Sequence, residues 1–223
     1  MTLKITLYSD LACPWCLIGH HRLDRVLAGS FPGESIDIQH HPVLLMQGLP
    51  AEGMNMAEFI RTRFGLSDPA QAWASAEAEA RSSGIAFDHR KVAMAYPTGR
   101  AHTLIRLAGP RGTQHALARR LIDDYLLNGA NIASPDLLAD VAMDYGFDRP
   151  EALRLVCDAQ ELTLTEAEIR AGTAKGVRTV PHFIVGGATL TGNQTEAALE
   201  AVIRSHSKGR GHSSDLGPLR LEH

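Results

Sequence analysis

Cysteine is scarce in this chain, with three residues in 223. So few thiols exclude the disulfide framework of small secreted domains. Two of the three nevertheless stand close together, as Cys13 and Cys16. A C-x-x-C pair in a protein of a reducing compartment is more often catalytic or metal-binding than structural.

Long apolar runs are also absent, so we expect no transmembrane helix. The chain enters an alternating apolar pattern directly after Met1, which leaves no room for a signal peptide and predicts a cytoplasmic protein. The net charge of −3 gives no reason to expect nucleic acid or membrane as a partner. Apolar residues make up 44% of the chain, which is enough for an ordinary globular core. Leu221-Glu222-His223 resembles the scar of a purification tag, so it is not interpreted as part of the fold.

The first 42 residues predict a strand, a helix and a second strand. Residues 2–8 and 35–41 alternate as strands do, and the second run stops at Pro42. Between them, Pro14 opens a helical pattern whose apolar face continues to Leu27 and which Gly29 ends. Two strands joined in this way form a parallel βαβ unit with a right-handed crossover.

The middle of the chain has helical composition and no convincing strand. The predicted helices are 56–64, 69–83, 101–108, 114–127, 135–145, 150–159 and 161–175. Strand character returns at 182–185 and 188–191, on either side of a Gly-Gly turn, and a final helix is predicted near 195–205.

These elements predict an α/β protein of two domains and a tail. Residues 1–42 and 177–206 would form one discontinuous sheet domain, and 43–176 an inserted helical domain. Residues 207–223 are polar and glycine-rich, and we expect a flexible tail there.

The position of the two thiols predicts their roles. Cys16 shares the apolar face of its helix and should be buried, whereas Cys13 precedes the first turn and should be exposed at the helix N-terminus. Unpaired N–H groups and the helix dipole favour a thiolate there. Cys13 should therefore attack a disulfide, and Cys16 should resolve the mixed disulfide that forms.

The cysteines also have other interpretations. Cys13, Cys16 and His20 have a C-x2-C-x3-H spacing that can bind zinc. No second C-x-x-C completes such a site, and a dithiol at a strand-to-helix junction suits redox chemistry better, so no metal is predicted. The third thiol, Cys157, lies in a helical pattern and should be a buried structural residue.

Val180-Pro181 stands where strand character returns. A proline is tolerated at the first position of a strand, and this one could face the C-x-x-C. From the residues alone a trans bond is the default, because only about 5–6% of X–Pro bonds in folded proteins are cis.

Four segments together resemble a known family. They are Cys13-Pro14-Trp15-Cys16-Leu17-Ile18-Gly19, Ala101-His102, Gly176-Val177-Arg178-Thr179-Val180-Pro181 and Thr191-Gly192-Asn193-Gln194. Over residues ~3–206 the chain is similar to the cytoplasmic DsbA-like oxidoreductases of the FrnE type. The resemblance implies a thioredoxin fold with an inserted α-helical domain, Cys13 as nucleophile and Cys16 as resolving thiol. It also implies a cis Pro181 packed against the active site and a Val180 backbone that pairs with substrate.

The chain departs from this family's pattern at three places. His182 replaces the usual aromatic residue, and it either brings an imidazole near the thiols or simply begins a strand. Asn193 replaces a small residue, and Pro97-Thr98 stands where relatives often have Asn-Thr. Two further side chains have two interpretations. Trp15 either faces substrate or packs against the helical block, and His102 either lines the cleft or is a core residue bonded to backbone.

The resemblance implies an enzyme, a thiol–disulfide oxidoreductase of protein or small-molecule disulfides. Its predicted substrate-binding residues are Pro14, Trp15, Val180, Pro181 and His182. No tightly bound cofactor is expected, with glutathione as a candidate co-substrate and a homodimer as a candidate assembly. One alternative is a glutathione-dependent isomerase or transferase of the 2-hydroxychromene-2-carboxylate isomerase and kappa-class group, which usually has serine at the nucleophile position. Another is a client-binding module like a chaperone. Pro14-Trp15 does not indicate the direction of electron flow.

Overall fold

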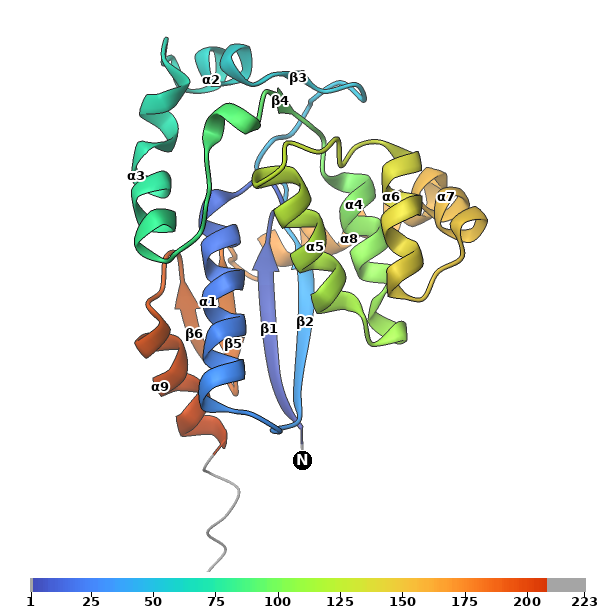
Figure 1. Cartoon of the computed structure of the whole chain (residues 1–223). Helices are drawn as coiled ribbons and strands as arrows, with labels where there is room; N and C mark the ends of the chain where they lie inside the picture. Colours follow the sequence, from blue (N-terminus) through green and yellow to red (C-terminus); the bar gives the residue numbers. More distant parts are fainter. Residues whose placement is uncertain (1, 208–223) are drawn as a thin grey trace, which may run out of the picture.

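The computed structural model describes residues 2–207 and is built around a four-stranded sheet of order β2-β1-β5-β6. Its strands are β1 (Leu3–Ser9), β2 (Ile36–Pro42), β5 (His182–Val185) and β6 (Ala188–Thr191). β1 pairs in parallel with β2 and antiparallel with β5, and β5 pairs antiparallel with β6. The sheet therefore joins the two ends of the described chain (Figure 1).

Helices cover both faces of this sheet. On one face lie α1 (Pro14–Ser30) and α9 (Glu196–Ser207), which also contact each other (Figure 1). Ile5 and Leu7 of β1 are fully buried on this side together with Leu23 of α1. On the other face, Gly172 of α8 (Ala159–Ala174) lies against the ring of Tyr8, and a Cβ at position 172 would come within 3.1 Å of it. The α/β thioredoxin fold is confirmed.

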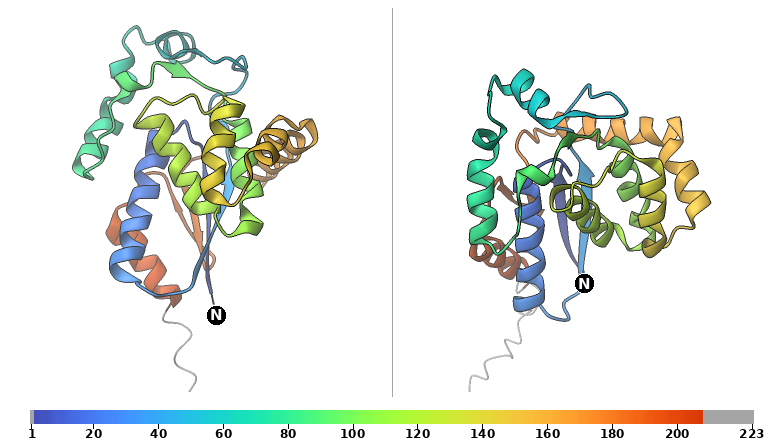
Figure 2. Two further views of the ribbon diagram at one scale, coloured as in Figure 1. Left: turned by 45° about the vertical axis from the view of Figure 1, so that its right-hand side comes forward. Right: turned by 45° about the horizontal axis from the view of Figure 1, so that its top comes forward.

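The chain between β2 and β5 is mainly helical and carries the helical insertion. Two of its helices, α2 and α3, extend past the end of α1, and the others gather beside β2 (Figures 1 and 2). Besides α8, the elements of this stretch are β3 (Met54–Asn55), α2 (Met56–Phe64), α3 (Pro69–Ser82), η1 (His89–Lys91), β4 (Met94–Ala95), α4 (Gly99–Leu107), η2 (Gly109–Arg111), α5 (Gln114–Leu126), α6 (Pro135–Ala142), η3 (Met143–Tyr145) and α7 (Arg149–Cys157).

Most predicted elements are confirmed to within a few residues, but the prediction of no strand in the middle of the chain was wrong. β3 and β4 pair antiparallel over two residues each, with Met54 opposite Ala95. Such a short ladder has no alternating pattern that a sequence could reveal. The predicted tail begins one residue too early, because Ser207 ends α9, and residues 208–223 lie outside the described part.

The side chains form two apolar cores that meet along α1. Leu23 and Val26 belong to the core between α1, α9 and the sheet, whereas Cys16, Leu17 and Ile18 belong to a larger core shared with the insertion. α3 and α5 both pack on α1, so its first half is buried on several sides. The burial of this half of α1 therefore extends beyond the one apolar face that its sequence shows.

Arg22 connects three segments at a buried position, since only 7% of the residue is exposed. From α1 it donates to Asn193 Oδ1 at 2.7 Å, and it also pairs with Glu79 of α3. It donates further to the Gln194 carbonyl and the Ser83 hydroxyl, at 2.8 Å each. The departure at Asn193 thus has a structural role, because its side chain accepts one of these bonds.

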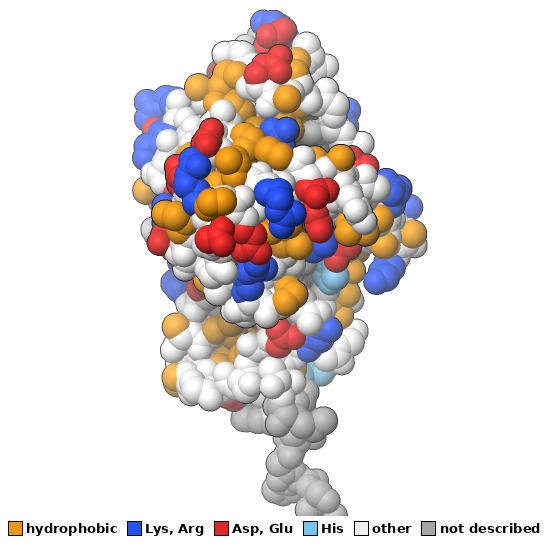
Figure 3. Space-filling view, turned by 90° about the vertical axis from the view of Figure 1, so that its right-hand side faces the viewer, with side chains coloured by type: hydrophobic (Ala, Val, Ile, Leu, Met, Phe, Trp, Pro, Cys, Tyr) orange, Lys and Arg blue, Asp and Glu red, His pale blue; other side chains and the backbone are white. Residues whose placement is uncertain are grey.

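The surface charge and the character of the helices both agree with the near-neutral, moderately apolar composition. The face in Figure 3 shows acidic and basic side chains interspersed rather than gathered by sign. Within residues 2–207, the helices lack the combined length and apolar character needed to cross a membrane.

Three histidines from different elements meet beside β2. His115 of α5 bonds Asp24 Oδ1 through Nε2 at 2.6 Å and His40 Nε2 through Nδ1 at 2.8 Å. His40 Nδ1, the other nitrogen of that ring, is buried and has no partner in the structure. The His20 ring lies 5.1 Å from that of His40, with both nitrogens buried and unpartnered.

We predict that the protein loses stability in acid through this cluster. Burial, then the neighbouring histidines, lowers the pKa of both His20 and His40 well below the usual value. The unfolded chain therefore binds more protons, so the stabilisation is complete above pH 6.5 and is lost as the pH falls below it. Urea titrations at pH 7.5 and 5.5 should differ by about 1 kcal/mol per histidine in the free energy of unfolding.

The variant His20→Leu should reduce this difference, because it removes one of the two protonation sites. His206→Gln, on α9 outside the cluster, is the matched control and should keep the full difference. An equal pH response in His20→Leu and the parent protein would contradict the assignment.

Candidate redox site

Cys13 is the N-cap residue of α1, with extended backbone angles of φ −99° and ψ 113°. Its carbonyl accepts the first helical bonds, from Cys16 N at 3.0 Å and Leu17 N at 3.1 Å. Pro14 occupies the first turn, where a missing N–H leaves no bond unmade. The strand-to-helix junction predicted from the sequence is therefore present, with the two thiols on its first turn.

The burial of Cys16 is confirmed, since none of the residue is exposed, but the prediction of an exposed Cys13 was wrong. Cys13 is only 3% exposed. The helix terminus would be open in a bare βαβ unit, but here residues of the insertion such as Trp73 and Ile60 pack in the same core as Cys13. The residue pattern within α1 carries no information about insertion residues that lie far away in the sequence and pack over Cys13.

The two thiols interact with each other. Burial raises the pKa of Cys16 well above its usual value, and a hydrogen bond with the Cys13 thiol adds to the effect. Both cysteines are free. Cys16 is therefore a shielded thiol directly behind Cys13, as a resolving thiol would be.

Cys13 lines an apolar pocket of about 290 Å³ between α1 and the insertion. Pro14 and Trp15 line it as well, and Trp15 is half-buried, packing on the core of the insertion while it faces the pocket. Apart from Ala12, the other walls come from the insertion and are Leu45, Met46, Met56, Phe59, Ile60, Phe64, Leu66, Ala72 and Trp73. Phe64 at the rim is 60% exposed. Sequence reasoning missed these walls, because nothing along the chain marks residues 45–73 as neighbours of Cys13.

Asp10, between β1 and α1, is a second feature that sequence reasoning missed. Its side chain is fully buried and accepts from the Thr98 hydroxyl at 2.9 Å and from Leu45 N at 2.7 Å. His102 Nε2 lies 3.3 Å from Oδ1, so this histidine bonds a carboxylate rather than backbone. The sequence did contain one signal for it, because Asp10 is the single acidic residue between the apolar first strand and the C-x-x-C.

The Val180–Pro181 bond is cis, as the resemblance implies, and Pro181 packs against α1. A Cβ on Gly19 would lie 3.0 Å from Pro181 Cγ and 3.2 Å from Phe183 Cζ. Gly19 follows Cys16 by one turn, so the loop that carries Pro181 reaches the first turns of α1. The Pro181 carbonyl accepts from Gly192 N at 2.8 Å, which fixes this loop to the β6 end.

His182 begins β5, and the structure does not bring its ring to the thiols. Side chains alternate along a strand, so His182 faces away from Pro181 and Phe183, which both contact α1. Its ring lies edge-on to Tyr8 at 5.7 Å. Partial burial lowers the pKa of His182. Of the two interpretations, the strand-opening residue fits.

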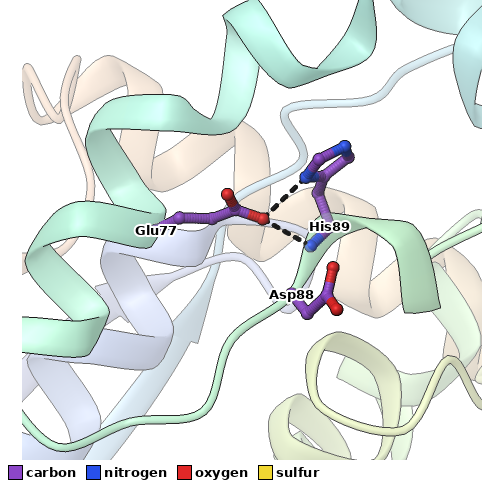
Figure 4. Close-up of side chains that lie close together, drawn as sticks. All are labelled: Glu77, Asp88 and His89. Atoms are coloured by element: carbon purple, nitrogen blue, oxygen red, sulfur yellow. Dashed lines mark hydrogen bonds and ion pairs between the residues drawn. The ribbon is translucent and has the colours of Figure 1, made fainter.

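Neither metal arrangement in the described residues forms an open site. His20 packs against His40 rather than with Cys13 and Cys16, so the zinc spacing is not realised. Glu77, Asp88 and His89 do come together (Figure 4). Glu77 Oε1 already accepts from His89 N at 2.8 Å and bonds His89 Nδ1 at 2.6 Å, and Asp88 pairs with Arg90. This cluster therefore ties α3 to η1.

Cys157 was predicted to be buried, and this prediction was wrong. It is exposed at the end of α7, while its neighbours Leu155 and Val156 face the core. Successive helix residues point about 100° apart, so a phase error of one residue moves Cys157 off the face that carries Leu155 and Val156.

The residues from 4 to 204 match the family model of the DsbA-like thioredoxin domain. The chain belongs to this family. A protein of Bacillus subtilis, YwbO, which is itself uncharacterized, is 22% identical over an alignment of 216 residues that covers 93% of this chain and 99% of YwbO.

Solved structures share the fold at low sequence identity. A probable DsbA oxidoreductase of Streptomyces coelicolor is 23% identical with a TM-score of 0.79, over 99% of this chain and 94% of that one. 2-Hydroxychromene-2-carboxylate isomerase has a TM-score of 0.69 at 14% identity, over 92% and 97%. The cytosolic disulfide reductase DsbM of Pseudomonas aeruginosa, solved with glutathione, has a TM-score of 0.62 at 16% identity, over 92% and 96%.

The contact between Gly19 and Pro181 makes a prediction about stability. Gly19→Ala should destabilise the protein by about 1–3 kcal/mol, because the new methyl group must displace Pro181 and Phe183 in a packed core. Gly29→Ala is the matched control on the same helix, where a Cβ meets nothing within 4 Å.

Gly29→Ala should stabilise the protein by up to about 1 kcal/mol through helix propensity. Chemical denaturation of both variants measures the difference. Equal stability of the Gly19→Ala and Gly29→Ala variants would show that Pro181 is not packed tightly against α1.

Proposed function

We propose that the protein is a thiol–disulfide oxidoreductase in which Cys13 is the nucleophile and Cys16 the resolving thiol. The observation that carries this proposal is the arrangement of the pair: Cys13 caps α1 and lines an apolar pocket, and Cys16 lies fully buried behind it. A substrate in the pocket can reach the first sulfur and not the second. Membership of the DsbA-like family supports the same chemistry.

The reaction proceeds in two exchanges. The Cys13 thiolate attacks one sulfur of a substrate disulfide, that S–S bond breaks, and the other substrate sulfur leaves and takes up a proton. Cys16 then attacks the Cys13 sulfur of the mixed disulfide and releases the second substrate thiol. The substrate gains two electrons, and the protein ends with a Cys13–Cys16 disulfide. A small thiol of the glutathione class would return it to the dithiol, and every step is reversible.

Val180 and Pro181 would hold the substrate backbone beside Cys13. Within residues 2–207, neither the N–H nor the C=O of Val180 has a hydrogen-bond partner, although the residue is 8% exposed. An extended substrate segment could supply both bonds by adding a strand-like pair. The apolar pocket suits a disulfide flanked by apolar groups.

Trapping tests the assigned roles. A Cys16→Ser variant should accumulate a mixed disulfide through Cys13 and lose turnover, because no second thiol can release the substrate. The experiment needs a Cys157→Ser background, since that exposed thiol can form adducts of its own. Mass spectrometry after digestion locates the adduct.

The Cys157→Ser parent should retain turnover, and a further Cys13→Ser change should abolish adduct formation. Persistent turnover in the Cys16→Ser variant would refute the two-thiol mechanism.

A glutathione-dependent isomerase is the second candidate, favoured by the similarity to 2-hydroxychromene-2-carboxylate isomerase and by the apolar pocket. The same Cys16→Ser variant separates the two functions. Isomerisation of an aromatic substrate with glutathione would survive the loss of Cys16, whereas disulfide turnover would not.

The pocket rim makes a separate prediction. Phe64→Ser should raise KM for an apolar-flanked peptide disulfide about fivefold, which corresponds to about 1 kcal/mol of lost apolar contact, and leave kcat unchanged. Met143→Ser is the matched control, since Met143 is 54% exposed and does not line this pocket. Equal KM values for both variants would exclude Phe64 from substrate binding.

A further inference from the structure

The Asp10 side chain is a buried acid that the two-exchange mechanism does not use. It is fully buried and surrounded by donors. Oδ1 accepts from the Thr98 hydroxyl and from Ala12 N at 3.3 Å and also bonds His102 Nε2, and Oδ2 accepts from Leu45 N. Three of these partners, the Thr98 hydroxyl and the N–H groups of Ala12 and Leu45, are donors, and they suit the acceptor-only ionised form of a carboxyl group.

This carboxylate belongs to the residue that borders both thiols. The Asp10 carbonyl accepts from Cys13 N at 3.2 Å, and Oδ1 accepts from the N–H of Ala12, the residue directly before Cys13. The pKa of Cys16 is raised by burial first, then by the Cys13 thiol and finally by the charge of Asp10, while the backbone of Asp10 acts in the opposite direction. Because Asp10, Cys13 and Cys16 are all buried, little water lies between them to screen this charge.

Charge near a C-x-x-C changes the balance between dithiol and disulfide. A strong oxidant of this class stabilises its reduced form, in which one sulfur is a thiolate. Here the α1 N-terminus supplies about half a positive charge in favour of the thiolate, and Asp10 supplies a full negative charge against it. The disulfide form carries no charge, so the Asp10 carboxylate does not destabilise it.

We propose that Asp10 is a positioning residue of the redox site, whose buried negative charge disfavours the thiolate and so directs the pair to give electrons to disulfides. The inference rests on the proposed function and adds its direction. The protein is then a reductase, and a small thiol of the glutathione class supplies the electrons that reset it. His102 and Thr98 hold the carboxylate in place.

The equilibrium with glutathione tests the direction. Purified protein is incubated at pH 8 in mixtures of reduced and oxidised glutathione, quenched with acid, alkylated, and scored by mass for dithiol and disulfide. The wild-type protein should be more reducing than the glutathione couple. Asp10→Asn should shift the equilibrium toward the dithiol by about tenfold, which corresponds to about 30 mV, and thiolate absorbance at 240 nm should appear at lower pH.

Three variants separate charge from structure. Thr98→Val and His102→Gln each disturb the contacts of Asp10 but keep its charge, so neither should move the equilibrium toward the dithiol. Asp24→Asn removes a negative charge from α1 about 12 Å along the helix from Cys16, and it should leave the equilibrium unchanged. Circular dichroism confirms that each variant is folded.

The proposal is overturned if Asp10→Asn leaves the equilibrium unchanged, or if His102→Gln shifts it as far toward the dithiol. It is also overturned by a wild-type protein that oxidises glutathione, a measurement that stands even if Asp10→Asn does not fold. A protein whose Cys13 and Cys16 never form a disulfide would refute the proposed function itself. A disulfide that forms but does not respond to Asp10 would refute only this inference.

Discussion

The hydrogen bonds of the Asp10 carboxylate are the constraint on which the site depends. A buried carboxylate is tolerated only when its oxygens are satisfied, so its donors must all be in place when the protein is folded. These donors come from the turn before α1, from the loop after β2 and from the start of α4. The carboxylate therefore fixes the insertion to the sheet at the point where the redox motif lies.

The two sides of the cysteine pair differ in chemistry as a result. In front of Cys13 the insertion presents apolar side chains from α2 and α3, which suit a substrate but cannot stabilise a charge. Behind the pair lie Asp10, Thr98 and His102, which are polar and closed to solvent. In the proposed mechanism, substrate binding and redox bias therefore belong to different residues.

Much of this organisation could be predicted from the sequence, because it depends on local signals. Pro14, the period of α1 and the turn at Gly186-Gly187 place the sheet elements and both thiols. The burial of Cys13 could not be predicted, since it is produced by residues about 50 positions away that pack over a helix terminus. The directions of the His182 and Cys157 side chains could not be predicted either. Each depends on where its strand or helix begins, and an error of one residue there turns the side chain to a different face. The role of Asp10 required knowing that Leu45, Thr98 and His102 meet in space.

The pairing of β1 with β5 has a consequence for how the chain reaches its native state. Tyr8 lies opposite His182, so nearly the whole described chain separates two neighbouring strands. The β1-α1-β2 unit and the β5-β6 hairpin are local, whereas joining them requires the ends of a very long loop to meet. A compact insertion shortens the distance that the loop must span. A compact helical insertion therefore lowers the entropic cost of joining the two halves of the sheet.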